Sequence, residues 1–196
     1  MDKKLENNGN SQNLFQKIDS MCDEIDNAVK AHLEEKKTVY IETSIVSYLT
    51  ARPSSNLLAA AWQKATLDWW DTQKNRFFLF TSNIVIEEAG KGDPKAAGLR
   101  VGALADIPLL EITDNALAFA KLLIDKSVLP QKAADDSLHI ALSVIHEIDY
   151  LLTWNFRHID NAETKPVIRK ICSDMGYTYP EICTPIELMG VYQNVG

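Results

Sequence analysis

The spacing of apolar positions changes along the chain, and each spacing predicts a different element. From Leu14 to Leu33 apolar residues recur every three or four positions, which predicts an amphipathic helix within residues 13–36. Residues 1–12 before it are polar and aperiodic and are expected to form a disordered tail. The charged residues 34–37 follow the helix, so we expect the main domain to span residues 37–190.

Within that domain short apolar runs alternate with helical patterns. The run Val39-Tyr40-Ile41 favours a strand that ends at Glu42 and turns into a helix. Further strands are expected at residues 77–81, 108–112, 149–153 and 181–184, and helices at 54–74, 84–89, 94–105, 114–126, 132–147 and 165–175. This alternation predicts an α/β fold, a three-layer α/β/α sandwich with a central parallel sheet.

The composition excludes several classes of protein. A length of 196 residues with 46% hydrophobic residues suits one compact domain with a short extension. A net charge of −7 disfavours a protein that coats nucleic acid, although it allows a small acidic site that cuts it. No apolar run is long enough for a membrane span and the start lacks a signal-peptide core, so a cytoplasmic protein is expected. The three cysteines have no paired spacing and are interpreted as core thiols.

Acidic or amide residues stand at the ends of several expected elements. They are Glu42 after the first strand, Glu87-Glu88 in the next helix, Asp135-Asp136 at the start of the helix before the fourth strand, and Asn155 after that strand. If their strands are neighbours, all these positions face the crevice at the carboxyl end of the sheet. Clustered carboxylates repel one another and call for a cation. Oxygen ligands without cysteine indicate Mg²⁺ or Mn²⁺.

Each of these residues also has a structural interpretation. Thr43 or Ser44 can cap a helix, and the acidic residues can be solvated or can favour a helix N-terminus. Ser82 or Asn83 is expected to cap the helix that follows the second strand. His139 and His146 are seven residues apart on one helix and are interpreted as surface or packed side chains, with no metal role.

Two other patterns leave alternatives open. The tryptophans of residues 54–74 are interpreted as core anchors rather than as a platform for stacking bases. The helix within residues 13–36 either packs on its own domain or contacts a partner or a second copy of the chain. Signature loops for dinucleotides, for nucleotide triphosphates and for serine hydrolases do not occur in the sequence.

Four motifs in this order resemble those of PIN-domain ribonucleases of the VapC type, the toxins of toxin–antitoxin pairs. They are Tyr40-Ile-Glu-Thr-Ser, Ser82-Asn-Ile-Val-Ile-Glu-Glu, Asp136-Ser-Leu-His-Ile-Ala and Leu151-Leu-Thr-Trp-Asn-Phe. The resemblance selects Glu88 over Glu87 and Asp136 over Asp135. It departs from the family at Glu42, where aspartate is usual, and at Asn155, where an acid is often found.

The resemblance implies cleavage of single-stranded RNA that depends on Mg²⁺ or Mn²⁺, and inhibition by a cognate antitoxin protein. Glu42, Glu88 and Asp136 would hold the metal and Asn155 would assist. Candidates for contacts with RNA phosphate are Thr43, Ser44, Arg52, Arg157 and His158. The alternative, suggested by Glu42, Asn155 and the additional helix, is a catalytically weakened module that binds protein or RNA. A homodimer is compatible with either function.

Overall fold

The computed structural model describes residues 16–18, 20–26 and 36–190. The chain forms two compact units, residues 1–36 and residues 37–196. In the first unit the described residues 16–18 and 20–26 are helical, and Ile18, Met21 and Ile25 are exposed. The expected tail, residues 1–12, lies outside the described residues, and the expected domain boundaries stay predictions.

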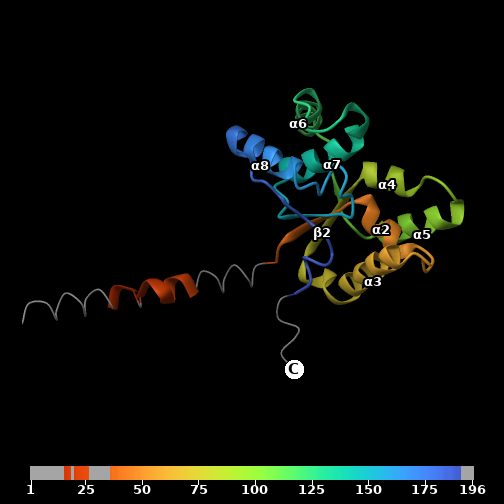
Figure 1. The fold of residues 1–196 in the computed structure, drawn as a ribbon, viewed down its shortest axis with the longest axis horizontal. Coiled ribbons are helices and arrows are strands. Elements are labelled where there is room, and N and C mark those ends of the chain that lie inside the picture. Colours follow the sequence, from red (N-terminus) through yellow and green to blue (C-terminus); the bar gives the residue numbers. More distant parts are fainter. Residues whose placement is uncertain (1–15, 19, 27–35, 191–196) are drawn as a thin grey trace, which may run out of the picture. The chain divides into compact units, whose positions relative to one another are not determined.

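The second unit is built on one sheet of five parallel strands, which confirms the predicted fold class (Figure 1). In chain order the strands are β1 (Thr38–Ile41), β2 (Phe78–Ser82), β3 (Leu109–Leu110), β4 (Tyr150–Leu152) and β5 (Glu181–Cys183). Their order across the sheet is β3-β2-β1-β4-β5. The central strand β1 is therefore paired on both sides, with Tyr40 opposite Phe80 of β2 and Leu151 of β4.

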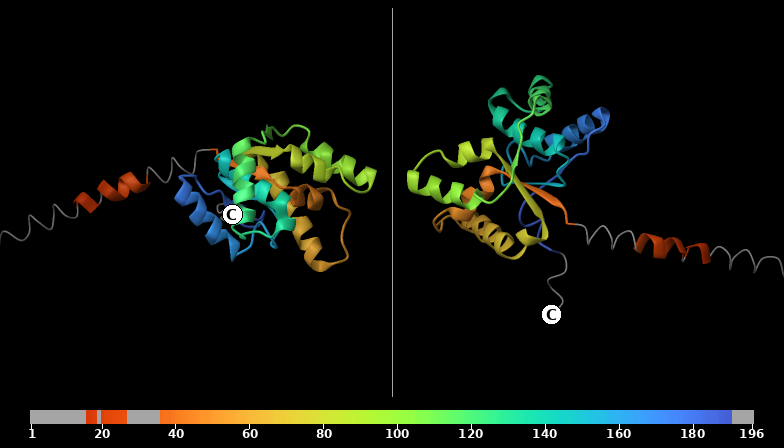
Figure 2. Two further views of the ribbon diagram at one scale, coloured as in Figure 1. Left: turned by 90° about the horizontal axis from the view of Figure 1, so that it is seen from above. Right: turned by 180° about the vertical axis from the view of Figure 1, so that it is seen from behind.

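Helices connect the strands and lie on both faces of the sheet. They are α2 (Thr43–Thr50), α3 (Leu57–Thr72), α4 (Asn83–Ala89), α5 (Pro94–Leu104), α6 (Asp114–Asp125), α7 (Ala134–Ile145) and α8 (Thr164–Met175), with short 3₁₀ turns at Lys74–Arg76 and Gln131–Ala133. Helices α2 to α5 pack together on one side, and α6 packs on α7 beside α8 on the other, as Figures 1 and 2 show. The result is the expected three-layer arrangement.

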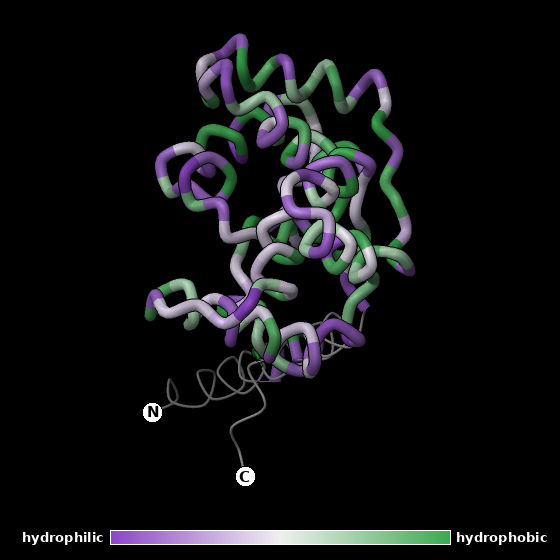
Figure 3. The backbone as a smooth tube through the Cα atoms, turned by 90° about the vertical axis from the view of Figure 1, so that its right-hand side faces the viewer, coloured by the Kyte–Doolittle hydropathy of each residue, from purple (hydrophilic) through white to green (hydrophobic). Residues whose placement is uncertain are grey.

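The core lies between the sheet and its helices. Val39, Tyr40 and Ile41 of β1 are fully buried, as expected for a parallel strand with both faces covered. Trp69 of α3 is also fully buried, and Trp62 and Trp70 pack against the core, which confirms their interpretation as core anchors. In Figure 3 hydrophobic and hydrophilic residues alternate along the helices, the pattern of helices that bury one face.

The order of the strands across the sheet changes direction beside β1. From β1 the chain moves outward to β2 and β3 on one side, and it returns to β4 and β5 on the other. The order therefore reverses between β1 and β4, and in open α/β sheets ligands bind outside the carboxyl ends of the strands at such a point. Beyond the strands the pairing continues, because the Glu42 N–H donates to the Leu152 carbonyl at 3.2 Å. This pairing brings the chain after β1 next to the chain after β4.

Three sequence expectations about individual side chains are wrong. The residue before the helix that follows β1 is Glu42, and the hydroxyls of Thr43 and Ser44, expected to cap this helix, bond carboxylates instead. The helix after β2 follows Ser82, but the Ser82 side chain bonds no backbone N–H of that helix. The Ser82 hydroxyl bonds a side chain of β1 instead. Cys172 and Cys183 are buried core thiols as expected, whereas Cys22 is exposed on the helical segment 20–26, which has no core of its own to bury it.

No helix among the described residues has the length and apolar character that a bilayer crossing requires.

Candidate metal centre

Glu42 stands at the point where the strand order reverses, and two hydroxyl groups, one after β1 and one after β4, bond its carboxylate. It is only 5% exposed. Its Oε2 accepts hydrogen bonds from the Ser44 hydroxyl and, at 2.7 Å, from the Thr153 hydroxyl. The two hydroxyl oxygens in turn accept backbone N–H groups, Ser44 from Trp154 at 2.8 Å and Thr153 from Asn155 at 2.9 Å. Ser44, which follows β1, and Thr153, which follows β4, therefore hold the same carboxylate oxygen of Glu42.

Glu88 reaches the same crevice from α4. Its Oε2 accepts a hydrogen bond from the Thr43 hydroxyl and lies 3.2 Å from Nε2 of His139. Burial alone would raise the pKa of the Glu88 carboxyl, but the hydrogen bond and charge of His139, the Thr43 hydroxyl and the nearby charge of Lys91 outweigh it and lower that pKa. Glu88 is therefore an anion at neutral pH. The adjacent Glu87 is exposed.

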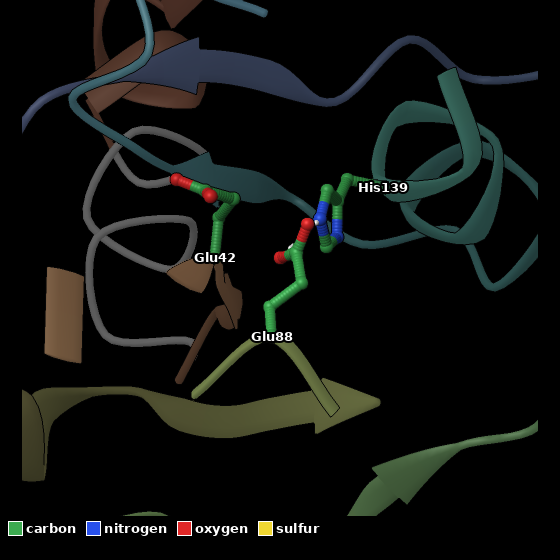
Figure 4. A group of neighbouring side chains, drawn as sticks. All are labelled: Glu42, Glu88 and His139. Carbon is green, nitrogen blue, oxygen red and sulfur yellow. Dashed lines mark hydrogen bonds and ion pairs between the residues drawn. The ribbon is translucent and has the colours of Figure 1, made fainter. Parts of the chain in front are cut away.

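The carboxylates of Glu42 and Glu88 and the imidazole of His139 form a tight group. One ligand atom of each lies within 4.8 Å of the others (Figure 4). His139, on α7, is 1% exposed. Burial lowers the pKa of its imidazole, but the hydrogen bond to Glu88 and the charges of Glu42, Glu88 and Asp136 raise it above its ordinary value. The surrounding carboxylates therefore favour the protonated form of His139.

Asp136 lies three residues before His139, in the first turn of α7. Its Oδ1 accepts a hydrogen bond at 2.7 Å from the amide nitrogen of Asn155, whose Oδ1 accepts the His158 N–H at 3.2 Å. Burial raises the pKa of the Asp136 carboxyl; the charges of His158 and His139 oppose that rise, and those of Glu42 and Glu88 add to it. Asp136 is therefore in the electrostatic neighbourhood of the two glutamates, although it is not part of the tight group.

The three carboxylates share one arrangement. In each, a single oxygen accepts the hydrogen bonds, namely Oε2 of Glu42, Oε2 of Glu88 and Oδ1 of Asp136. Within the described residues no hydrogen bond is found to the other oxygen, and none of the three forms an ion pair with a lysine or arginine. Each side chain is thus oriented by the protein and keeps one oxygen for another ligand.

This donor set suits a hard divalent cation. Free carboxylate oxygens that are oriented by outer hydrogen bonds are the ligands of Mg²⁺ and Mn²⁺ sites, which also keep several waters. The mutual repulsion of Glu42, Glu88 and Asp136 would be relieved by such an ion. His139 offers a nitrogen at the same place and could serve as a ligand for a softer metal.

Of the predicted contact residues, Thr43, Ser44 and His158 lie at this centre. The hydroxyl of Thr43 orients Glu88, and that of Ser44 orients Glu42. The charge of His158 acts on Asp136. Arg157, in the same loop, is exposed. Arg52 is exposed beyond the end of α2, where it lines an open cleft of about 600 Å³ with Lys95 and Arg100 of α5.

Three residues of the centre have no role in the sequence-based prediction: His139, Tyr40 and Thr153. A sequence signal existed for His139, because Asp136 and His139 are spaced i, i+3 and so share one helix face. Tyr40 had a weaker signal, since a tyrosine in a fully buried strand needs a partner for its hydroxyl. Thr153 had none, because its role depends on the pairing of β1 with β4. His146 lies elsewhere and its Nε2 bonds the Glu111 carbonyl at 2.8 Å.

No family model matches the chain, and a search of curated proteins also finds no match. Among solved structures, the chain is similar to one in the "Crystal structure of VapBC2 from Rickettsia felis bound to a DNA fragment from their promoter". The identity is 10%, the TM-score is 0.48, and the match covers 75% of this chain and 98% of that chain. A similarity of this size carries no argument about activity, metal or partner. Any assignment of function therefore depends on the geometry of the centre and on the four sequence motifs.

Proposed function

We propose that the protein is a metal-dependent endoribonuclease that hydrolyses phosphodiester bonds in single-stranded RNA. The observation that carries the proposal is the set of three carboxylates, each with one oriented and one free oxygen, where the strand order reverses. A single divalent cation, Mg²⁺ or Mn²⁺, would be held by Glu42, Glu88 and Asp136. When bound, such an ion acidifies water and stabilises negative charge on a phosphate.

The residues of the chain have separate tasks in this proposal. Ser44 and Thr153 hold Glu42, and Thr43 and His139 hold Glu88, so that each carboxylate is oriented and keeps one oxygen for the cation. Asn155 donates its amide N–H to Asp136 and thereby orients the third carboxylate. Asn155 is in this way a positioning residue for a ligand, and its neutral side chain adds no charge to the centre.

The substrate and the partners are proposed from the motif resemblance to VapC-type ribonucleases. Arg157 and His158, which follow Asn155 in one loop, are candidates to contact a phosphate beside the cleaved bond, and Arg52 is a candidate for a more distant phosphate. A cognate antitoxin protein would cover the centre. A homodimer and a cytoplasmic location belong to the same proposal.

The proposal is tested by incubating the purified full chain with a single-stranded RNA and Mg²⁺ or Mn²⁺. We expect fragments that disappear with EDTA and with Asp136→Asn, which removes one charged ligand and keeps the acceptor for Asn155. The matched control is Asp135→Asn, because Asp135 is the exposed neighbour on the same helix turn. Equal cleavage by Asp136→Asn and the unmodified chain would refute the assignment, and arms with duplex RNA and single-stranded DNA test the substrate class.

The second candidate is a PIN-like binding module with weakened catalysis. It is favoured by Asn155, which stands where related motifs carry an acid and whose amide is engaged by Asp136 and His158. The two candidates differ in their response to metal. A Mn²⁺-dependent rise in melting temperature that is lost in Glu88→Gln and kept in Glu87→Gln supports the enzyme, whereas tight binding of RNA or protein without any metal response supports the module.

A further inference from the structure

A chain of buried polar side chains runs from β2 through β1 to α7 and ends on Glu88. The hydroxyls of Ser82 and Tyr40 are 2.6 Å apart, and the Tyr40 hydroxyl is 2.9 Å from Nδ1 of His139. Nε2 of the same imidazole is 3.2 Å from Oε2 of Glu88. Ser82, Tyr40 and His139 are all 1% exposed or less, so water does not compete for these contacts.

The chemistry at each end fixes the direction of the hydrogen bonds. An ionised carboxylate only accepts, so Nε2 of His139 must carry a proton toward Glu88. In the neutral imidazole Nδ1 then accepts the Tyr40 O–H, and Tyr40 accepts from Ser82. In the charged imidazole Nδ1–H donates to Tyr40, which donates to Ser82. The chain of contacts is complete in both cases, because each hydroxyl can donate and accept.

Glu88 therefore receives two hydrogen bonds on Oε2, one from His139 and one from Thr43 of α2. They come from two different helices and leave the carboxylate little freedom to rotate. Oε1 is the oxygen left for a ligand. Aligned carboxylates bind metal better than free ones, because the cost of ordering the side chain is met before the ion arrives.

We infer that His139 is a positioning residue for Glu88, held in place by Tyr40 and Ser82, and that it acts by donating its Nε2–H to the carboxylate rather than by binding the cation. The opposite arrangement has the proton on Nδ1, donated to Tyr40, and the Nε2 lone pair on the metal. The inference builds on the metal centre of the proposed function, but the proton position on His139 can be measured without any metal.

The first experiment is long-range ¹H–¹⁵N correlation NMR of the metal-free full chain at a pH where His139 is neutral. We expect the shift of a protonated nitrogen at Nε2 and of an unprotonated one at Nδ1, with the Nε2 signal displaced in Glu88→Gln. A protonated Nδ1 and unprotonated Nε2 would overturn the inference. A chain that cleaves no RNA but shows Nε2–H bonded to Glu88 would refute the proposed function and leave the positioning role intact.

The second experiment compares two substitutions at His139. One keeps a donor near the position of Nε2, which contacts Glu88, and the other keeps a polar group near the position of Nδ1, which contacts Tyr40. The Gln side chain in His139→Gln can place an amide N–H near the position of Nε2, whereas Asn in His139→Asn is shorter and reaches only the position of Nδ1. A positioning role predicts that the Mn²⁺ dissociation constant, measured by calorimetry, rises less in His139→Gln than in His139→Asn. A role in packing alone would impair both variants equally, and that result would overturn the inference.

The third experiment tests the outer part of the chain with a milder change. Tyr40→Phe removes only the hydroxyl that fixes the imidazole, and we expect roughly a 10-fold loss of Mn²⁺ affinity, as for other outer contacts of metal sites. Tyr48→Phe is the matched control, because Tyr48 packs edge-on against Trp62 and takes no part in the hydrogen bonds between Ser82, Tyr40, His139 and Glu88. Unchanged Mn²⁺ affinity in Tyr40→Phe, or nitrogen coupling to bound Mn²⁺ in electron spin-echo spectra that is lost in His139→Gln, would contradict the positioning role.

Discussion

Acidic side chains stand at both edges of the sheet, and the two edges treat them differently. At the amino edge, Oδ2 of Asp149 accepts the N–H and the hydroxyl of Thr38, each at 2.8 Å, and Oδ1 is 3.8 Å from the Lys37 ammonium. Both oxygens have partners, and a cation balances the charge. At the carboxyl edge, Glu42 and Glu88 each have one bonded oxygen and no lysine or arginine ion pair among the described residues.

The difference separates a structural carboxylate from a candidate ligand. Asp149 ties the start of β1 to the start of β4, and its contacts are complete within the protein. The carboxylates of the metal centre are also oriented by hydrogen bonds, but within the described residues none of them forms an ion pair with a lysine or arginine. The positive charges that act on them are those of His139, of Lys91 near Glu88 and of His158 near Asp136. Carboxylates that are oriented by the protein but not paired with a lysine or arginine form a group that could hold a metal ion.

The largest expected difference between the two edges is their response to a divalent cation. At a Mn²⁺ concentration of ~100 times the dissociation constant, binding to the folded state should add ~2.7 kcal/mol to the free energy of unfolding. Glu42→Gln should lose most of this gain, because it removes a ligand and keeps the acceptors for Ser44 and Thr153. Asp149→Asn should keep all of it. Urea titration with and without Mn²⁺ measures these values. Loss of the Mn²⁺ response in Asp149→Asn would show that the two edges of the sheet do not differ in cation binding.

The next effect concerns stability without metal. Asp149→Ala removes the acceptor for two hydrogen bonds of Thr38, which should lower the free energy of unfolding by about 1–2 kcal/mol. The exposed i, i+4 pair partner Asp174 provides the control, and Asp174→Ala should stay within about 0.5 kcal/mol of the unmodified chain. Chemical denaturation in EDTA checks both values. A cost for Asp149→Ala no larger than that of the control would show that the amino edge does not need its carboxylate.

The third effect is the pH dependence of cation binding, which tests whether Asp136 is a ligand. Because burial raises the pKa of Asp136, this carboxyl takes up a proton at a higher pH than an ordinary aspartate. The proton competes with the cation, so Mn²⁺ affinity should fall as the pH drops through this raised pKa, by up to about tenfold per pH unit for one proton. Calorimetric titrations over a pH series test this. An affinity that is independent of pH until the range of ordinary aspartates would show that Asp136 is not a ligand.

The smallest effect is a gain in stability. A carboxyl whose folded-state pKa is raised stabilises the fold fully below its unfolded-state pKa, and this contribution is lost as pH rises through the folded-state pKa. At neutral pH the charge of Asp136 therefore costs stability. Asp136→Asn in EDTA should raise the free energy of unfolding by less than about 1 kcal/mol, since solvent screens a half-exposed group. The gain should vanish in acid, and a loss of stability at neutral pH would contradict the account.

The sequence predicted the order and type of the elements well where their patterns are local. The run from Val39 to Ile41 is fully buried and strand-like in composition, and it forms β1. Residues 108–112 were predicted as a short strand, and only Leu109–Leu110 pairs, at the edge of the sheet. The length of β3 depends on its backbone pairing with β2 and not on its own pattern of apolar residues.

The four sequence motifs identified candidate residues of the site but not the contacts that orient them. Glu42, Glu88, Asp136 and Asn155 were selected from positions at element ends. The structure brings Glu42 and Glu88 into one tight group and places Asp136, which bonds Asn155, in their electrostatic neighbourhood. The orientation of Asn155, with its amide nitrogen on Asp136, could not be predicted because it depends on the backbone of the following loop. The hydroxyl of Thr153 reaches Glu42 through strand pairing across 111 positions of sequence, and no local pattern encodes such a contact.

The most direct test of the account is the anomalous diffraction of crystals of the full chain grown or soaked with Mn²⁺. The account predicts one strong peak in the crevice beside β1, about 2.1 Å from a free oxygen of each of Glu42, Glu88 and Asp136. Data from Glu42→Gln crystals under the same conditions should show the peak weakened or gone. A peak bonded to Nε2 of His139 would refute the positioning role, and a crevice without any peak at saturating Mn²⁺ would contradict the metal centre itself.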